Sequence, residues 1–302
     1  MRWKNQRRSK NVDDRRGQSA GFRRSGASPM VARLIPTLMR SKYGRYILIF
    51  GVIIIFGGQM LGVDILPLLL GGGATQQSSQ SQQLSPEAQE LADFVTVVLA
   101  DTEDTWNRIF KNEGGEYQEP ILVLFTGSVN SACGSASAAV GPFYCPGDHQ
   151  LYIDLSFYDD LKTRHQAPGD FAQAYVIAHE VGHHVQNLLG TNESVRRAQQ
   201  SASEAHANNL SVRMELQADC YAGLWGYYAH NERGLLDAGD LEEALVAASA
   251  IGDDRLQREA TGRVVPDSFT HGTSEQRVRW FKKGFDNGDI NVCNTFASGV
   301  NL

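Results

Sequence analysis

The chain of 302 residues has little cysteine, with four in all, and no two of them form a close pair. Structural zinc sites usually draw ligands from close cysteine pairs, so that class of site is excluded. Proline is scarce as well, with nine residues, and none lies between Asp170 and Gly190. No internal repeat is apparent, which argues against a repeat architecture. These absences favour one sizeable core and an unbroken helix over residues 170–190.

The segment 170–190 also has the positive signs of a helix. Asp170 suits the N-cap, Gln173 falls where a capping box has its second member, and Gly190 suits a C-terminal stop. Apolar residues recur between them at helical spacing, namely Phe171, Ala174, Tyr175, Ala178, Val181, Val185 and Leu188. We therefore predict one continuous helix here.

This predicted helix carries the sequence His179-Glu180-Val181-Gly182-His183. One turn takes about 3.6 residues, so His179 and His183 project from the same face and can share one metal ion. Glu180 lies about 100° around the axis, where it can reach water at the metal without being a ligand. The alternative is a solvated polar face, which fits poorly with the small and apolar neighbours of these residues. Among such neighbours a charged glutamate is costly to bury unless it is paired or lies near a cation.

A carboxylate pair further along can supply the third ligand that a tetrahedral zinc site needs. Residues 211–228 have the pattern of a second helix, and Glu215 and Asp219 lie four residues apart on it. We expect Glu215 to be the ligand and Asp219 to accept a hydrogen bond from a liganding histidine. Two alternatives stay open: Asp219 is the ligand instead, or both acids lie on an exposed face.

The two histidines and the later Glu-x-x-x-Asp helix resemble the gluzincin metallopeptidases. Further segments resemble the bacterial neutral zinc metallopeptidase family more closely, over nearly the whole chain: Cys133-Gly134, 141–146, 174–190, 215–223 and 270–277. The resemblance implies an α+β, zincin-like domain, mainly helical with a small sheet, that uses Zn²⁺ to hydrolyse peptide or protein substrates. One departure is the interval 184–214 before Glu215, which is longer than in the thermolysin type.

The same resemblance implies roles in catalysis. Glu180 acts as general base for the attacking water, and His271 donates to the oxyanion. For His271 the alternative is a loop histidine that caps or packs against the helix after it. Arg277, on that helix, is expected to orient the site.

Other histidine patterns are excluded by position. His184 points about 100° away from His183 and cannot join the same ligand set. A metzincin needs glycine and histidine where this chain has Gln186 and Leu189. His206 lies in a polar stretch, residues 192–209, that is typical of a surface segment.

The first 84 residues differ in composition from the rest. Residues 1–45 hold thirteen Lys and Arg against two Asp, a balance of +11. Since the net charge of the whole chain is −6, the remaining residues carry −17. Apolar residues follow over 46–70 and include the uncharged run 46–63, long enough to cross a bilayer. Residues 71–84 are rich in Gly, Ser and Gln, as in a flexible linker.

These features predict a disordered basic head over 1–45, a transmembrane anchor over 46–70, and a metallopeptidase domain over 85–302. By the positive-inside tendency, the head stays in the cytoplasm and the domain lies outside the inner membrane of a bacterium. A cleaved signal peptide is the alternative, but the basic region is long and a small-x-small cleavage site is missing. A membrane span explains the arginines better than nucleic-acid binding, so no nucleic-acid partner is expected.

Within the domain we predict a helix over 85–110 and strands over 121–125 and 150–155, the second strand forming the rim of the cleft. Three cysteine pairings are possible, and we favour Cys133 with Cys145 and Cys220 with Cys293. The functional alternative to an enzyme is a non-catalytic metal-binding or scaffolding domain at the membrane surface. The sequence has no signal for an oligomeric state.

Overall fold

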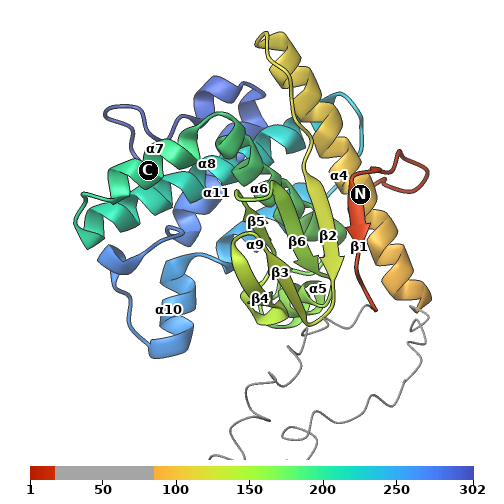
Figure 1. The fold of residues 1–302 in the computed structure, drawn as a ribbon, viewed down its shortest axis with the longest axis horizontal. Helices are drawn as coiled ribbons and strands as arrows, with labels where there is room; N and C mark the ends of the chain where they lie inside the picture. The colour runs from red at the N-terminus through yellow and green to blue at the C-terminus, as the bar shows by residue number, and fades with distance from the viewer. Residues whose placement is uncertain (18–84) are drawn as a thin grey trace, which may run out of the picture. The chain divides into compact units, whose positions relative to one another are not determined.

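The computed structural model describes residues 1–17 and 85–302 (Figure 1). Within these residues, one sheet has the strand order β1-β2-β6-β5, formed by Val12–Asp14, Ile121–Phe125, Gln150–Asp154 and Phe143–Cys145. Strands β1, β2 and β6 run parallel, and β5 runs antiparallel to β6. A separate antiparallel pair joins β3 (Ser128–Ser131) to β4 (Gly134–Ser137). The predicted strands at 121–125 and 150–155 are confirmed to within one residue.

Helices make up most of the described chain, as the sequence predicted: α4 Pro86–Asn112, α5 Phe157–Thr163, α6 Asp170–Leu188, α7 Thr191–Gln199, α8 Glu204–Asn231, α9 Asp240–Ala250, α10 Asp253–Thr261 and α11 Ser274–Asn287. Short 3-10 turns lie at Ala138–Val140, Pro266–Ser268 and Ile290–Cys293. The mainly helical fold with a small sheet is therefore confirmed. The helix that carries Glu215 begins earlier than expected and takes in His206, which is exposed.

Helix α6 begins one residue earlier than predicted, because Gly169 and not Asp170 is its N-cap, and no side chain caps it. Asp170 is instead the first helical residue. Its Oδ1 forms an ion pair with the α-ammonium nitrogen of Met1 at 3.1 Å. The capping-box assignment to Asp170 and Gln173 is thus wrong. The acid is held by a cation from far away in the chain, which local sequence patterns do not reveal.

Two close helix crossings bring the chemical residues together. On α6, a Cβ added to Gly182 would lie 3.0 Å from the backbone oxygen of Ala218 on α8. On α11, a Cβ added to Gly284 would lie 2.0 Å from the backbone oxygen of Cys220 on the same α8. Glycine therefore permits both α6 and α11 to approach α8. The histidines of α6, the acids of α8 and Arg277 of α11 meet as a result.

The edge of the sheet beside α6 is β5, not β6. Strand β6 lies between β2 and β5, so the prediction that residues 150–155 form the rim is wrong. The disulfide between Cys133 and Cys145 ties the turn of the β3–β4 pair to the end of β5. The second disulfide joins Cys220 of α8 to Cys293. Both favoured cysteine pairings are confirmed.

Residues 1–17 belong to the same compact unit as the domain. Strand β1 pairs with β2, with Val12 opposite Leu122. The guanidinium of Arg7 binds buried Glu103 at 3.0 Å, and the ring of Trp3 packs edge-on against Phe94. The predicted disordered head is therefore wrong for residues 1–17, because Trp3 and Arg7 have partners on α4 and the backbone of residues 12–14 pairs with β2.

The rest of the predicted head (18–45), the predicted anchor (46–70) and the predicted linker (71–84) lie outside the described residues. Across residues 1–17 and 85–302, no helix has the length and apolar character needed to cross a membrane.

Candidate metal centre

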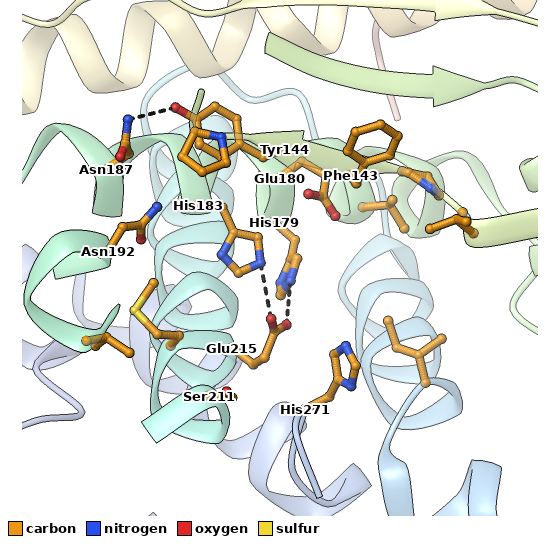
Figure 2. A pocket seen from close by; sticks show the side chains of 18 of the residues that line it. Phe143, Tyr144, His179, Glu180, His183, Asn187, Asn192, Ser211, Glu215 and His271 are labelled. Atoms are coloured by element: carbon orange, nitrogen blue, oxygen red, sulfur yellow. Dashed lines mark hydrogen bonds and ion pairs between the residues drawn. The ribbon is translucent and has the colours of Figure 1, made fainter. Parts of the chain in front are cut away.

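Three side chains from two helices converge on one point (Figure 2). His179 and His183 extend from α6, and Glu215 extends from α8 toward them. Nε2 of His179 lies 3.1 Å from Oε2 of Glu215, and Nε2 of His183 lies 3.5 Å from Oε1. One atom from each of the three residues lies within 4.8 Å of the other two. The predicted ligand set thus comes together across 36 positions of sequence between His179 and Glu215.

The other ring nitrogen of each histidine is already engaged. Nδ1 of His179 donates to Oδ1 of Asp219 at 2.9 Å, and Nδ1 of His183 lies 2.9 Å from Oε1 of Gln186. A carboxylate or an amide oxygen can only accept, so both rings carry their proton on Nδ1 when neutral. Each Nε2 is therefore left with a free lone pair that faces Glu215, as a metal ligand requires.

The electrostatics of these three groups are strongly coupled. Burial would lower the pKa of His179, but the carboxylates of Asp219 and Glu215 outweigh it and raise that pKa to about 9. Burial would likewise raise the pKa of Glu215, but His183 and His179 hold it well below its ordinary value. In the absence of an ion, the carboxylate of Glu215 is held by protonated imidazole. A bound metal cation would replace the positive charge of that imidazole.

Asp219 is the centre of a buried network behind His179. Its two oxygens accept from Nε and Nη2 of Arg277 at 2.8 and 2.9 Å, and Oδ1 also accepts from the hydroxyl of Tyr175 at 2.5 Å. Burial would raise the pKa of Asp219, but Arg277 and His179 lower it to about 2. Asp219 therefore lies where the prediction put it, behind a histidine and not among the three converging residues, and Arg277 orients it.

Glu180 lies beside the two histidines without pointing at their meeting point (Figure 2). It is 8 % exposed and lines the same cleft. Burial raises its pKa, against the opposing charges of His183 and His179. A carboxylate with a raised pKa in a cleft is suited to exchange protons.

His271 lies on the loop before α11, apart from the converging trio (Figure 2). Asp253, at the start of α10, accepts from the backbone N–H groups of Thr270, His271 and Gly272 at 2.7, 2.6 and 3.1 Å. The same acid lies 3.3 Å from Nδ1 of His271, and this hydrogen bond raises the pKa of the imidazole. His271 is thus held by its loop and aimed into the cleft, and it does not cap α11, whose N-cap is Thr273.

His184 is directed away from the site, as its position on the helix predicted. Its Nε2 donates to the backbone oxygen of Gln118 at 2.6 Å, and its Nδ1 accepts from the hydroxyl of Tyr144 at 3.1 Å. Burial lowers its pKa to about 4, so the ring is neutral at pH 7. It supports the cleft wall through Tyr144.

All of the candidate residues except Asp219 line one cleft of about 910 Å³. Its walls also include Phe143 of the edge strand, Arg196 of α7 and Leu256 of α10. Phe143 and Tyr144 of β5 line the cleft, and its volume has room for a chain segment as well as a small molecule. Its position places the three converging side chains and Glu180 within reach of one ligand.

The residues fit a zinc ion by their chemistry. Two imidazole nitrogens and one carboxylate oxygen are the donor set of catalytic zinc sites, which leave a further position for water or substrate. Both imidazoles have the partner at Nδ1 that such ligands need, and the third ligand is charged. The ligand assignment remains a prediction, but the geometry meets its requirements.

A family model described as "Putative neutral zinc metallopeptidase" matches residues 1–296. The chain belongs to this family. A protein of Escherichia coli strain K12, "Uncharacterized protein YpfJ", is 52% identical over 300 residues, which cover 99% of this chain and 100% of that protein. A protein of Mycobacterium tuberculosis strain H37Rv, "Uncharacterized protein Rv2575", is 45% identical over 215 residues, 68% of this chain and 72% of that protein. No solved structure matches the chain.

This membership in the zinc metallopeptidase family confirms the resemblance that the motifs indicated. The matched range includes residues 1–17, which contain β1. Tyr175, Gln186 and Asp253 were not predicted to be parts of the site. Tyr175 could have been found, because it lies four residues before His179 on the same helix face. The partner role of Asp253 has no local signal.

Proposed function

We propose that the chain is a zinc-dependent peptidase that hydrolyses amide bonds in peptide or protein substrates. The observation that carries the proposal is the convergence of His179, His183 and Glu215 within 4.8 Å on the wall of a cleft that also holds Glu180. The family supports a zinc peptidase in general terms. The roles of Glu180 and His271 are part of this proposal.

Glu180 is proposed to accept a proton from the attacking water as the oxygen bonds to the amide carbon, and to pass that proton to the leaving nitrogen as the carbon–nitrogen bond breaks. Its raised pKa suits both steps. When bound, a zinc ion supplies Lewis-acid chemistry that polarises the carbonyl and acidifies water. His271, held by Asp253, donates a hydrogen bond to the oxygen on which negative charge develops.

An extended peptide is expected to lie along β5, the edge strand beside the cleft. Its backbone can add to the side of Phe143–Cys145 that has no partner strand within residues 1–17 and 85–302, as peptides do at other open sheet edges. This arrangement brings an amide bond past Glu180, which lines the same cleft as Phe143 and Tyr144 of that strand.

The test uses the full chain, because residues 1–17 supply a strand of the sheet. Zinc content of the purified protein is measured first, followed by cleavage of unfolded proteins by the wild type and by Glu180→Gln. Loss of cleavage by about 10²-fold or more with zinc retained is the expected result. Zinc binding with equal activity in both forms, or with no activity, would favour the non-catalytic metal-binding or scaffolding alternative.

We also propose that the protein works at a bacterial membrane, through residues 46–70, in an oxidising compartment that suits its two disulfides. The pairing of β1 with β2 limits this proposal. A single crossing with residues 1–45 inside and 85–302 outside would separate two paired strands. Residues 1–17 and 85–302 are therefore expected on one side.

Labelling of single added cysteines at exposed positions in each range by an impermeant thiol reagent tests this, and labelling of only one range in intact cells would contradict it.

A further inference from the structure

A chain of amide groups runs from His183 to the second disulfide. Nδ1 of His183 lies 2.9 Å from Oε1 of Gln186 on the same helix. Nε2 of Gln186 lies 2.6 Å from the backbone oxygen of Met214 and 3.1 Å from Oε1 of Gln217. Nε2 of Gln217 lies 3.1 Å from the backbone oxygen of Cys293, whose sulfur is bonded to Cys220.

The far end of this chain fixes the direction of every hydrogen bond in it. The backbone oxygens of Met214 and Cys293 can only accept, so Gln217 and Gln186 must turn their NH₂ groups toward them. Oε1 of Gln186 is then left to face His183, and it accepts the proton of Nδ1. The orientation of a side chain next to the site is thus set by backbone groups on α8 and on the segment that follows α11.

Burial makes this arrangement hard to change. Gln186 is 0% exposed and Gln217 is 6% exposed, so neither amide can exchange its partners for water. Leaving one of these buried groups unpaired would be costly, because no water replaces the lost hydrogen bond. The amides therefore hold one orientation, and His183 meets a permanent acceptor on the side away from Glu215.

The two histidines differ in the charge of their partners. His179 has the carboxylate of Asp219, which is itself paired with Arg277, whereas His183 has a neutral amide. We propose that Gln186, anchored by Gln217 and by the backbone oxygens of Met214 and Cys293, is a positioning residue that sets the tautomer and direction of His183 for metal binding. This inference rests on the proposed zinc site and is independent of whether peptides are cleaved.

The experiment measures the zinc affinity of full-length protein by competition with a chelator, together with the melting temperature of the zinc-free form. Gln186→Leu removes the acceptor for His183, and a loss of about 10- to 100-fold in zinc affinity is expected. Gln186→Glu keeps an acceptor at that place but loses the donor to Met214, so its zinc-free stability should fall while its zinc affinity stays near that of the wild type.

Gln257→Leu is the matched control. The side chain of that glutamine, on α10, makes two hydrogen bonds, with the backbone of Val265 and the hydroxyl of Ser268, but it lies outside the cleft lining. Its zinc affinity should equal that of the wild type. Equal weakening in Gln186→Leu and Gln186→Glu would indicate a merely structural role, and wild-type affinity in Gln186→Leu would also overturn the inference.

Two further arms keep the experiment decisive. Should Gln186→Leu fail to fold, Gln217→Leu tests the same chain of amides, because it frees Gln186 from one of its two anchors. Weaker zinc binding is expected there, and unchanged binding would overturn the inference. A wild-type chain that binds no zinc would instead overturn the proposed function, so the two failures are distinguishable.

Discussion

Arg277 and Asp219 form a buried, two-point ion pair directly behind the metal centre. Nε and Nη2 of the guanidinium reach separate carboxylate oxygens at 2.8 and 2.9 Å, and both side chains are at most 2% exposed. Paired donors of this kind fix the carboxylate in direction as well as in charge. Asp219 can therefore hold His179 rigidly while its own charge stays balanced.

Replacement of Arg277 by Met should destabilise the fold by about 3–5 kcal/mol, because Asp219 would stay buried without its cation. The free energy of unfolding in denaturant measures the effect. Arg279→Met, two residues along on the exposed side of α11, is the matched control and should change it by less than about 0.5 kcal/mol. Similar losses of unfolding free energy in both variants would show that the buried Arg277–Asp219 pair contributes no more than an exposed arginine.

Zinc affinity should rise with pH across the neutral range. The pKa of His179 is about 9 without an ion, and that of His183 is raised as well, so zinc must displace at least one proton at pH 7. We expect the apparent affinity to increase about tenfold or more for each pH unit between 6.5 and 8.5. Chelator competition at several pH values, with the chelator corrected for its own protonation, checks this. A flat profile would contradict the charge state assigned to His179.

The α-ammonium of Met1 should contribute stability that is lost in alkaline solution. Burial would lower its pKa, but Asp170 and Asp240 raise it above its ordinary value. A raised pKa in the folded state means that the contribution is complete below about pH 8 and disappears as pH rises through the higher, folded-state pKa.

Melting temperatures between pH 7 and 10 check this contribution. A variant with Gly-Ser added before Met1 is the control, since the added residues move the ammonium away from the acids. It should melt lower than the wild type at pH 7, and the difference should shrink toward pH 10. A difference that stays constant with pH would mean that the charge of the terminus is unimportant.

The two disulfides should differ in what their loss costs. They close loops of 73 and 12 residues, so the chain-entropy model assigns about 4 kcal/mol to Cys220–Cys293 and about 3 kcal/mol to Cys133–Cys145. The first bridge also anchors the amide chain behind His183, so its removal should weaken zinc binding as well.

Paired Cys→Ser variants of each bridge, measured for unfolding and for zinc affinity, separate these effects. Zinc affinity should fall on loss of Cys220–Cys293 and stay close to the wild-type value on loss of Cys133–Cys145. Equal zinc affinity in the two variants would show that the metal site does not depend on the Cys220–Cys293 bridge next to Asp219.

The predictable parts of this protein are those with a local pattern. The helix that holds His179 and His183 follows from spacing over a few residues, and Glu215 with Asp219 follows from the same logic on a second helix. The grip of Asp253 on the His271 loop could not be predicted, because it joins segments that lie about 20 residues apart with no periodic pattern between them. The edge position of β5 depends on the order of strands, which spacing alone does not determine.

The basic amino terminus is the clearest case of a pattern with two meanings. Arginines before an apolar run suggested a head apart from the domain, yet Arg7 binds Glu103 and Arg16 donates to the backbone of Ala88 on α4. Positive charge near a membrane segment and positive charge that pairs with a distant acidic helix have the same composition. Only the fold separates them.

The parallel pairing of Val12 with Leu122 has a consequence for biosynthesis. The partner of β1 leaves the ribosome 110 positions after β1 itself, which at about 5–20 residues per second is a delay on the order of 5–20 s. For most of that time the first strand has an unpaired edge, and Arg7 lacks its partner Glu103. Nascent chains of this protein should therefore need protection early in translation, and a stall before residue 122 should leave them prone to aggregate.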